Sequence, residues 1–575
     1  MHATDYAIVV TYLGVVLFLG RRVRGARDSE EAFFLAGRKL GILRQSFFNF
    51  GQSTDANTAV STVSFVYGEG VSGAWLQLQL IFLNPYYWFM NVWFRRTRLM
   101  TTADLFEERL HSPRLARFYA AFQIGVAVVG IAFANFVSYK VASALMLGGP
   151  VVAPWLFYTG FAAIVGFYVA VGGLEATVTN QMFQGVLVLI FSVILLPFGW
   201  SALGSGGLRH RLPQRMFDMF AGGGSGQFTG WAVVSVLVVS VIQANGNIIN
   251  MGLAGSARSE FAARMGGVTG TYGKRVMIAL WVFVGLIAAG ICQGADRLAD
   301  PDLAWGSLSR RLLPAGFLGF MFIGLLAANM AAIATRTMAI SALFVRNLYR
   351  PASGVRDERR EVVIGQVAGA AALAASVATA LAMNEAFAVT KFILTINIPF
   401  GAAVLLMFFW RRLTRAAVWW GVLTTGLLVL ITPLGAHIGR NGGFSAEGWV
   451  LARAGLPFAG FGAGGHLAAQ FLFDAFFPFA VMIAVSLVTS PPPQESVARF
   501  FGKMKTPIGA TPQLDLEALS QTRSNPGRFD RTKLFPGSSW EFTRWDRTDA
   551  VGFAACCAAS VSIVGAVWLA LSWLR

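Results

Sequence analysis

The sequence predicts an all-α polytopic membrane protein with about fourteen transmembrane helices, and three observations support this fold class. Of the 575 residues, 55% are hydrophobic and 13% are charged, whereas about a quarter of a soluble domain is charged. Apolar runs of about 18 or more residues, long enough to cross a bilayer, recur along the chain. Several runs end in basic pairs such as Arg95-Arg96 and Arg411-Arg412, which is typical of membrane loops.

The expected spans follow one another with short connections. In chain order they are residues 5–20, 44–70, 72–95, 116–147, 151–171, 177–201, 229–253, 274–294, 311–347, 362–383, 386–411, 415–436, 468–490 and 548–574. Each is justified by an apolar run bounded by charged or turn-forming residues, although the run at 44–70 and the run at 229–253 contain polar clusters. The polar stretch 491–547 has no apolar periodicity of its own, so we expect a loose cytoplasmic tether there.

The net charge of +18 is explained by orientation rather than by nucleic-acid binding. Most of the 46 Lys and Arg residues lie in loops expected on one side of the membrane, which places that side in the cytoplasm. The first residues, MHATDYAIVV, have no basic region before the apolar run, so we expect no cleaved signal peptide. Both termini are then extracytoplasmic, in a multi-pass protein of the bacterial inner membrane.

Enzyme chemistry and metal binding have no support in the sequence. Cys292, Cys556 and Cys557 have neither disulfide nor metal-ligand spacing. No Ser-His-Asp set or phosphate-binding loop stands where it could act. We therefore expect no enzyme activity, no metal site and no cofactor.

Two apolar spans carry polar clusters at equivalent points of two five-span runs. The first reads NFGQSTDANTAVS, and the second reads VIQANGNIIN. So many hydrogen-bonding side chains in a membrane span must face protein or water, and glycine between amides allows the helix to unwind. Polar packing between helices would explain either cluster alone. The pairing favours an inverted-repeat transporter with its binding site between the repeats. The candidate solute-binding residues are Gln52, Ser53, Asp55, Asn57, Gln243, Asn245 and Asn247.

This pairing divides the chain into six regions. They are an N-terminal flanking helix and cytoplasmic loop (1–43), a first inverted repeat (44–201), a second inverted repeat (229–411), C-terminal flanking helices (412–490), a cytoplasmic polar segment (491–547) and a last transmembrane helix (548–575).

Six motifs in register resemble the sodium/solute symporter family, which includes sodium-coupled sugar and proline carriers. They are FFLAGRKLG (33–41), VYGEGVSGAW (66–75), TTADLFEERL (101–110), VGGLEATVTNQMFQG (171–185), LAANMAAIATRTMAISALFVRNLYR (326–350) and FFWRRLTRAAVWWG (408–421). The resemblance implies a LeuT-type core of five plus five helices with flanking helices on either side.

The resemblance also implies where a sodium ion would bind, and this chain departs from that pattern. In the family, two adjacent hydroxyl side chains of the eighth core helix face carbonyl groups of the unwound first helix. The hydroxyl positions match Ala331 and Ala332, which have no oxygen to give. A family aspartate matches Gln181. The carbonyl positions match Ser53, Ala56 and Ala328. Since a desolvated cation needs several oxygens, we expect a degraded sodium site.

A buried arginine offers an explanation for this loss. Arg336 follows Ala331 and Ala332 by about one helical turn, and Thr335 precedes it. Because an arginine in a membrane span needs a partner, we hypothesise that Arg336 pairs with Asp55 or with the unwound carbonyls in place of sodium. The alternative is an inner-gate ion pair with no part in coupling.

Two lysines also lie within expected spans. Lys140 could meet a structural partner or contact the solute, and the sequence does not separate these roles. Lys391 lies near the end of its span, where its side chain can extend to the interface.

The function predicted is alternating-access transport of a small polar organic solute, sugar-like or amino-acid-like, without the usual sodium site. A sodium symporter with a modified ion site is the first alternative. A transporter-like solute sensor is the second, and it is disfavoured because 491–547 is too small for a signalling domain. The expected partners are the solute and the lipid bilayer; we expect neither nucleic acid nor an obvious protein partner.

Overall fold

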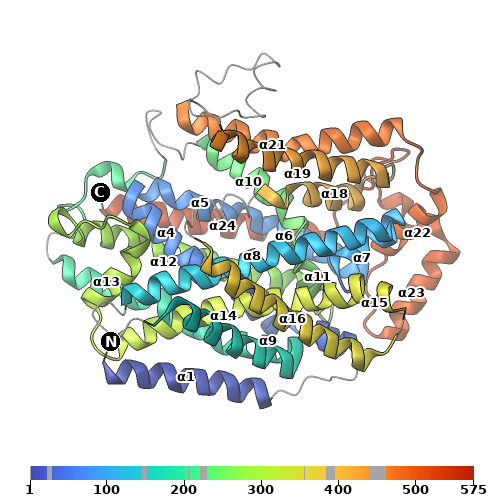
Figure 1. The fold of residues 1–575 in the computed structure, drawn as a ribbon. Helices are drawn as coiled ribbons and strands as arrows, with labels where there is room; N and C mark the ends of the chain where they lie inside the picture. Colours follow the sequence, from blue (N-terminus) through green and yellow to red (C-terminus); the bar gives the residue numbers. More distant parts are fainter. Residues whose placement is uncertain are drawn as a thin grey trace.

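The fold is a bundle of long helices, seen here in a computed structural model of the chain (Figure 1). The structure describes residues 2–22, 29–145, 152–204, 207–220, 230–354, 356–383, 395–438 and 462–574. Lys391 therefore lies outside the described residues. Within the described ranges the chain is helical and forms no strand, with isolated bridges such as Leu40 to Ala257.

The α-helices are α1 (Ala3–Arg22), α2 (Glu30–Leu35), α3 (Ile42–Ser53), α4 (Ala56–Glu69), α5 (Trp75–Leu78), α6 (Asn84–Thr97), α7 (Thr102–Leu110), α8 (Pro113–Leu145), α9 (Pro154–Leu203), α10 (Gly230–Asn245), α11 (Asn250–Gly255), α12 (Glu260–Ile291), α13 (Ala304–Leu312), α14 (Phe317–Leu343), α15 (Arg350–Ser353), α16 (Glu358–Leu381), α18 (Ile398–Phe409), α19 (Arg415–Ile438), α21 (Gly462–Val488), α22 (Gln494–Lys505), α23 (Pro512–Ser524) and α24 (Arg547–Leu574).

Of the described helices, eight are long and apolar enough to cross a membrane, and α10 and α18 are shorter apolar helices. The all-α membrane fold is thereby confirmed, while the number of about fourteen spans stays a prediction. Both termini lie at one end of the bundle, and α22 and α23 lie at the other (Figure 1). We call the latter the tail end.

Both predicted helix interruptions are present. The first polar cluster divides into α3 and α4, which meet at Thr54 and Asp55. The second divides into α10 and α11, with Gly246 in the connection. The two expected spans 151–171 and 177–201 form the single element α9, which Gly173 interrupts with a φ of 57°. A side chain at Gly173 would also meet the backbone oxygen of Phe33 at 2.8 Å, so only glycine fits this turn.

One predicted boundary is wrong in a way that matters for the site. The expected span 274–294 begins much earlier, since α12 starts at Glu260 with the Ser259 side chain as its N-cap. The stretch before residue 274 resembles a loop because it is rich in glycine. Its glycines instead let α12 approach α3: a Cβ at Gly266 would lie 2.2 Å from the Cβ of Gln45, and one at Gly270 would lie 2.3 Å from the Ser46 oxygen. Small residues allow such close helix packing in membranes.

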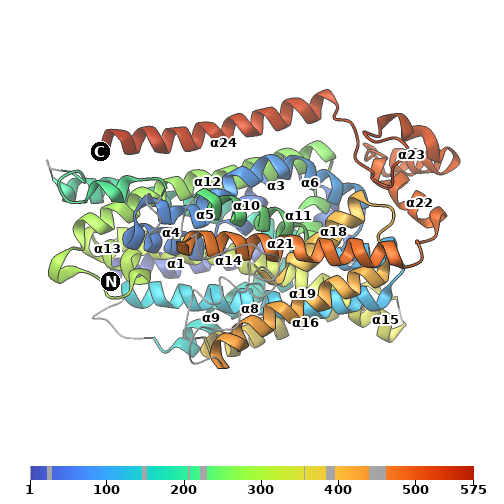
Figure 2. The same ribbon diagram turned by 90° about the horizontal axis from the view of Figure 1, so that it is seen from above.

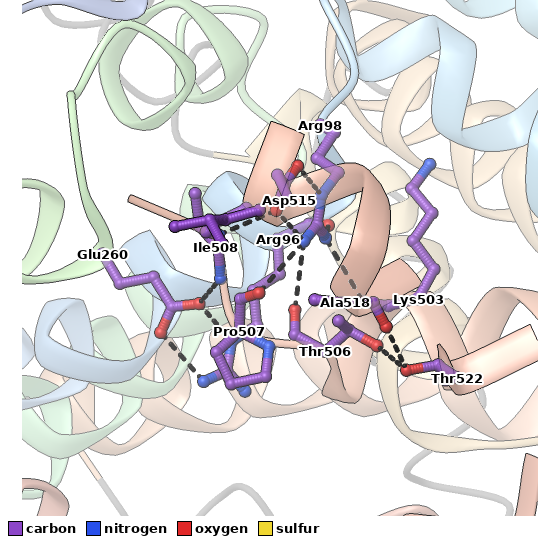
Figure 3. Close-up of polar contacts among 12 residues, drawn as sticks. Arg96, Arg98, Glu260, Lys503, Thr506, Pro507, Ile508, Asp515, Ala518 and Thr522 are labelled. Carbon is purple, nitrogen blue, oxygen red and sulfur yellow. Dashed lines mark hydrogen bonds and ion pairs between the residues drawn. The ribbon is translucent and has the colours of Figure 1, made fainter. Parts of the chain in front are cut away.

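The expectation of a loose tether at 491–547, which we call the tail, is also wrong. Its helix α22 buries Val497, Phe500, Phe501 and Met504, a helical periodicity that the sequence analysis overlooked. The guanidinium of Arg98, at the end of α6, donates to both carboxylate oxygens of Asp515 at 2.7 and 2.8 Å (Figure 3). The tail is therefore packed against the bundle, and α24 then runs back along the outer face of the bundle (Figure 2).

Candidate functional site

The first helix break presents a carboxylate and a free carbonyl in the core. Asp55 is the N-cap of α4, and its Oδ1 accepts hydrogen bonds from the backbone N–H of Thr58 at 2.9 Å and from its hydroxyl at 2.6 Å. The interruption leaves the carbonyl of Ser53 outside the helical ladder. A negative charge at a helix N-terminus is favourable, so the fold itself holds Asp55 in place.

The direct cationic partner of this break is Lys274, which the sequence analysis missed. Lys274 is buried on α12, and its ammonium donates a hydrogen bond to the Ser53 carbonyl. It also lies within electrostatic range of Asp55 and Arg336. The apolar run predicts a span that begins at residue 274, but residue 274 lies about four turns inside α12. The N-cap at Ser259 is the sequence signal that could have placed it in the helix.

The predicted ion pair between Arg336 and Asp55 is not made in this structure. Arg336 is within electrostatic range of Asp55, yet the ion pairs found among the described residues do not include Asp55. The Arg336 guanidinium instead donates to the Gly130 oxygen of α8, at 3.5 Å. Lys274, and not Arg336, reaches the unwound carbonyl. The physical reason is that α12 packs closely on α3 through its glycines, whereas Arg336 turns towards α8.

The positions matched to a sodium site are occupied by tightly packed protein groups. The side-chain amide of Gln181 donates to the Ala331 carbonyl at 2.9 Å and to the Thr335 hydroxyl at 2.8 Å. A Cβ at Gly51 would lie 3.1 Å from Cγ of Gln181 and 3.3 Å from Cβ of Ala331. Helices α3, α9 and α14 therefore pack closely together around Gly51.

The three alanines that complete this region are also enclosed. Ala56, Ala328 and Ala332 are each at most 1% exposed. The backbone N–H of Ala56 donates to the side-chain oxygen of Asn329 at 3.0 Å, so Asn329 ties α14 to the start of α4. Asn329 is not among the site residues predicted from the sequence.

The second break is braced by side chains of α6 and α8. Asn245 accepts a hydrogen bond from the Tyr86 hydroxyl at 2.6 Å. The carbonyl of Gly246 accepts one from the Tyr119 hydroxyl at 2.8 Å and one from the Gln123 amide at 3.2 Å. Asn247 accepts from the N–H of the neighbouring Ile249 at 3.3 Å. In this conformation, protein groups already make many of the hydrogen bonds that we expected a solute to make at the second break.

Other polar groups near the breaks remain available. The side-chain oxygens of Thr54 and Asn57 are buried without a hydrogen-bond partner, and so are both amide atoms of Asn135 on α8. Gln52 and Gln243 are half-buried. Buried polar groups are nearly always satisfied, so such atoms are natural positions for water or a polar ligand.

Lys140 lies apart from this centre. Its ammonium pairs with Asp300 at 3.3 Å and with Asp302 at 3.4 Å, at the end of the bundle that carries the termini. These two carboxylates account for its charge. The structure therefore favours the structural role that the sequence left open, and solute contact by Lys140 gains no support.

On the tail side of the first break, a cavity of about 20 Å³ separates the two broken helices from α14. Phe48 of α3, Ile248 and Ile249 beside α11, and Thr335 and Met338 of α14 line it. This volume suits about one water molecule. The three elements thus converge on one small, mostly apolar space beside Thr335.

Comparison with known proteins agrees with this fold. Residues 33–425 match a family model described as the sodium:solute symporter family. The chain is 21% identical to solute carrier family 5 member 4B of Mus musculus, over 92% of this chain and 85% of that protein. It is 22% identical to a sodium/proline symporter of Staphylococcus aureus, over 75% of this chain and 87% of that protein. The solved structure of a Na⁺-coupled sialic acid symporter has a similar fold, with a TM-score of 0.69 and 13% identity over 86% of this chain and 99% of that chain.

Proposed function

The chain belongs to the sodium:solute symporter family, and from this premise we propose that it carries a small polar organic solute without using the family's usual sodium position. It is a multi-pass membrane transporter and not an enzyme. The two helix breaks support a binding site between the repeats. Transport then follows when the bundle rocks around that site and opens it to each side in turn.

One observation carries the sodium-independent part of this proposal. The Ser53 carbonyl, where an ion would be expected, already accepts a hydrogen bond from Lys274, and the carbonyl of Ala331, at a position matched to a hydroxyl ligand, accepts one from Gln181. A desolvated cation needs several oxygen lone pairs directed at it. Here an ammonium and an amide N–H point at those lone pairs instead. Lys274 and Arg336 then supply positive charge near Asp55 permanently, and Thr335 lines the small cavity between the broken helices and α14.

A thermal-unfolding experiment tests this. Purified protein is heated in sodium chloride and in choline chloride, each with a panel of sugars, amino acids and nucleosides. A ligand that binds the folded state raises the melting temperature by mass action. We expect the same solutes to stabilise the protein to the same extent in both salts.

Sodium symport at a modified site predicts a different result, in which stabilisation by the solute needs sodium. That result would refute the sodium-independent proposal. A matched pair of variants, Lys274→Met and Lys140→Met, locates the effect. The first removes the ammonium at the break, and we expect sodium to bind more readily there; the second removes an ammonium that pairs with Asp300 and Asp302, and its sodium response should match the wild type.

A further inference from the structure

The first helix break holds more positive than negative charge. Among the described residues, the charged groups within electrostatic range of Lys274 are one acid, Asp55, and two cations, Arg275 and Arg336. Arg336 likewise lies within electrostatic range of Asp55, and this is the acid that it shares with Lys274. Even with Arg275 left aside, two cations face one carboxylate in the interior of the bundle.

Other acids of the described bundle are committed to other cations. Glu175 pairs with Arg44 at 2.7 Å, and Asp104 pairs with Arg346 at 2.6 Å. Asp300 and Asp302 pair with Lys140, as described above. None of these carboxylates is available to neutralise the positive charge at the first helix break.

Arg275, itself a cation without a charged partner among the described ion pairs, adds to the excess. It is 2% exposed, and its Nε lies 3.4 Å from the side-chain oxygen of Asn84 on α6, which is neutral. Its Nη1 is buried without a hydrogen-bond partner. An uncompensated positive charge in a membrane interior costs free energy. Binding of a negatively charged group at the first helix break would lower this cost.

The cations at the break also have unused hydrogen-bond donors. An ammonium carries three N–H groups and a guanidinium carries five. The described contacts use one N–H of Lys274, on Ser53, and one of Arg336, on Gly130 at 3.5 Å. Asp55 uses its Oδ1 to cap α4. The N–H donors of Lys274 and Arg336 thus outnumber the protein acceptors that they contact in the described structure.

We propose that the solute is a small monoanion, a carboxylate, whose charge is met by Lys274 and Arg336. Its uncharged polar groups meet the unpartnered oxygens and amides near the break, such as those of Asn57 and Asn135. This inference rests on the proposed function, since it assumes that a polar solute binds beside the first break. Binding of one anion leaves two negative and two positive charges in the site.

The test uses the full-length protein and pairs of probes that differ in charge at nearly constant shape: lactate with lactamide, pyruvate with pyruvamide, nicotinate with nicotinamide, and gluconate with glucose. Thermal stabilisation is measured in choline buffer and in sodium buffer at equal ionic strength. We expect stabilisation by at least one carboxylate, with its uncharged partner binding at least tenfold more weakly.

Variants locate the charge that recognises the probe. We expect Arg336→Gln and Lys274→Gln each to weaken the carboxylate response at least tenfold, Arg336→Lys to retain part of it, and Lys140→Gln to leave it unchanged. Size-exclusion chromatography confirms that each variant is folded. The proposal is overturned if an uncharged partner binds as tightly as its carboxylate, if neither Gln variant weakens binding, or if no carboxylate stabilises the protein.

The two proposals fail separately. If carboxylates bind only in sodium buffer, the sodium-independent function is wrong while the charge assignment stands. If uncharged solutes bind equally in both buffers and carboxylates do not, the charge assignment is wrong while the proposed function stands.

Discussion

Gly401 of α18 lies where the second helix break comes closest to a neighbouring helix. A Cβ at this position would lie 1.9 Å from the Ile242 oxygen and 3.2 Å from the Cα of Gln243. Across the same contact, a Cβ at Gly246 would lie 2.8 Å from the Gly401 nitrogen. The two glycines therefore allow α18 to pack directly on the backbone that carries the candidate solute-binding amides.

We predict that Gly401→Ala destabilises the protein by about 1–3 kcal/mol, because the added methyl group forces α18 away from α10. Differential scanning fluorimetry of the purified variant measures this as a lower melting temperature. Gly160→Ala on α9 is the matched control, since a Cβ there meets nothing within 4 Å. Alanine should be neutral or slightly stabilising at that position. Equal melting temperatures for the two variants would contradict the packing argument.

At the scale of elements, Arg98 makes several of the contacts between the tail and the bundle. Besides Asp515, the Arg98 guanidinium donates to the carbonyls of Thr506 at 3.3 Å and Pro507 at 3.2 Å (Figure 3). Glu260, at the start of α12, accepts a hydrogen bond from the Ile508 N–H at 2.8 Å. The segment between α22 and α23 thus joins the end of α6 to the start of α12, the helix that carries Lys274.

We predict that Asp515→Asn loosens the tail, because Arg98 loses its charged partner in a half-buried position. The cost of about 1–3 kcal/mol corresponds to roughly 5- to 160-fold faster amide exchange in residues 494–524, measured by hydrogen–deuterium exchange. Glu495→Gln serves as control: its partner Arg499 is one turn away, and the two side chains are 89% and 69% exposed. Such surface pairs contribute little. Unchanged exchange in Asp515→Asn would show that apolar packing of α22 suffices.

At the scale of the whole molecule, carboxylates in the tail hold the tail end together. Burial raises the pKa of Asp515, but hydrogen bonds from Arg98 and the Gly509 N–H outweigh it and leave the pKa below its ordinary value. Burial likewise raises the pKa of Glu541, and hydrogen bonds from Lys505 and Lys533 more than reverse this. Both carboxylates therefore favour the docked tail when they are ionised.

The sign of the pH dependence follows. A carboxyl with a lower pKa in the folded state stabilises the fold above its unfolded pKa, which is about 4, and that stabilisation is lost as the pH falls through the folded pKa. We predict that the docked tail is insensitive to pH between 5 and 7 and loosens below about 4. The stacked pair Trp410 and Trp540, with ring centres 5.6 Å apart, reports the change through tryptophan fluorescence. Loosening that begins on raising the pH would contradict the assignment.

The sequence by itself determined the membrane class, the family resemblance and the position of both helix breaks. Apolar run length and local polar clusters are written in consecutive residues, so no distant contact is needed to recognise them. The same holds for the loss of oxygen at Ala331 and Ala332. The apolar periodicity of α22 is also a local pattern. The sequence therefore contains the signal for this helix, and the prediction of a loose tether overlooked it.

Only the tertiary structure decided which charges meet. Lys140 lies with Asp300 and Asp302, and Lys274 reaches the carbonyl of Ser53, more than two hundred residues earlier in the chain. Such pairings depend on how closely α12 packs on α3, which glycine allows but does not specify in any local pattern. Helix packing determines which charged residues far apart in the sequence become partners. For that reason, the residues that meet at the site could be identified only from the fold.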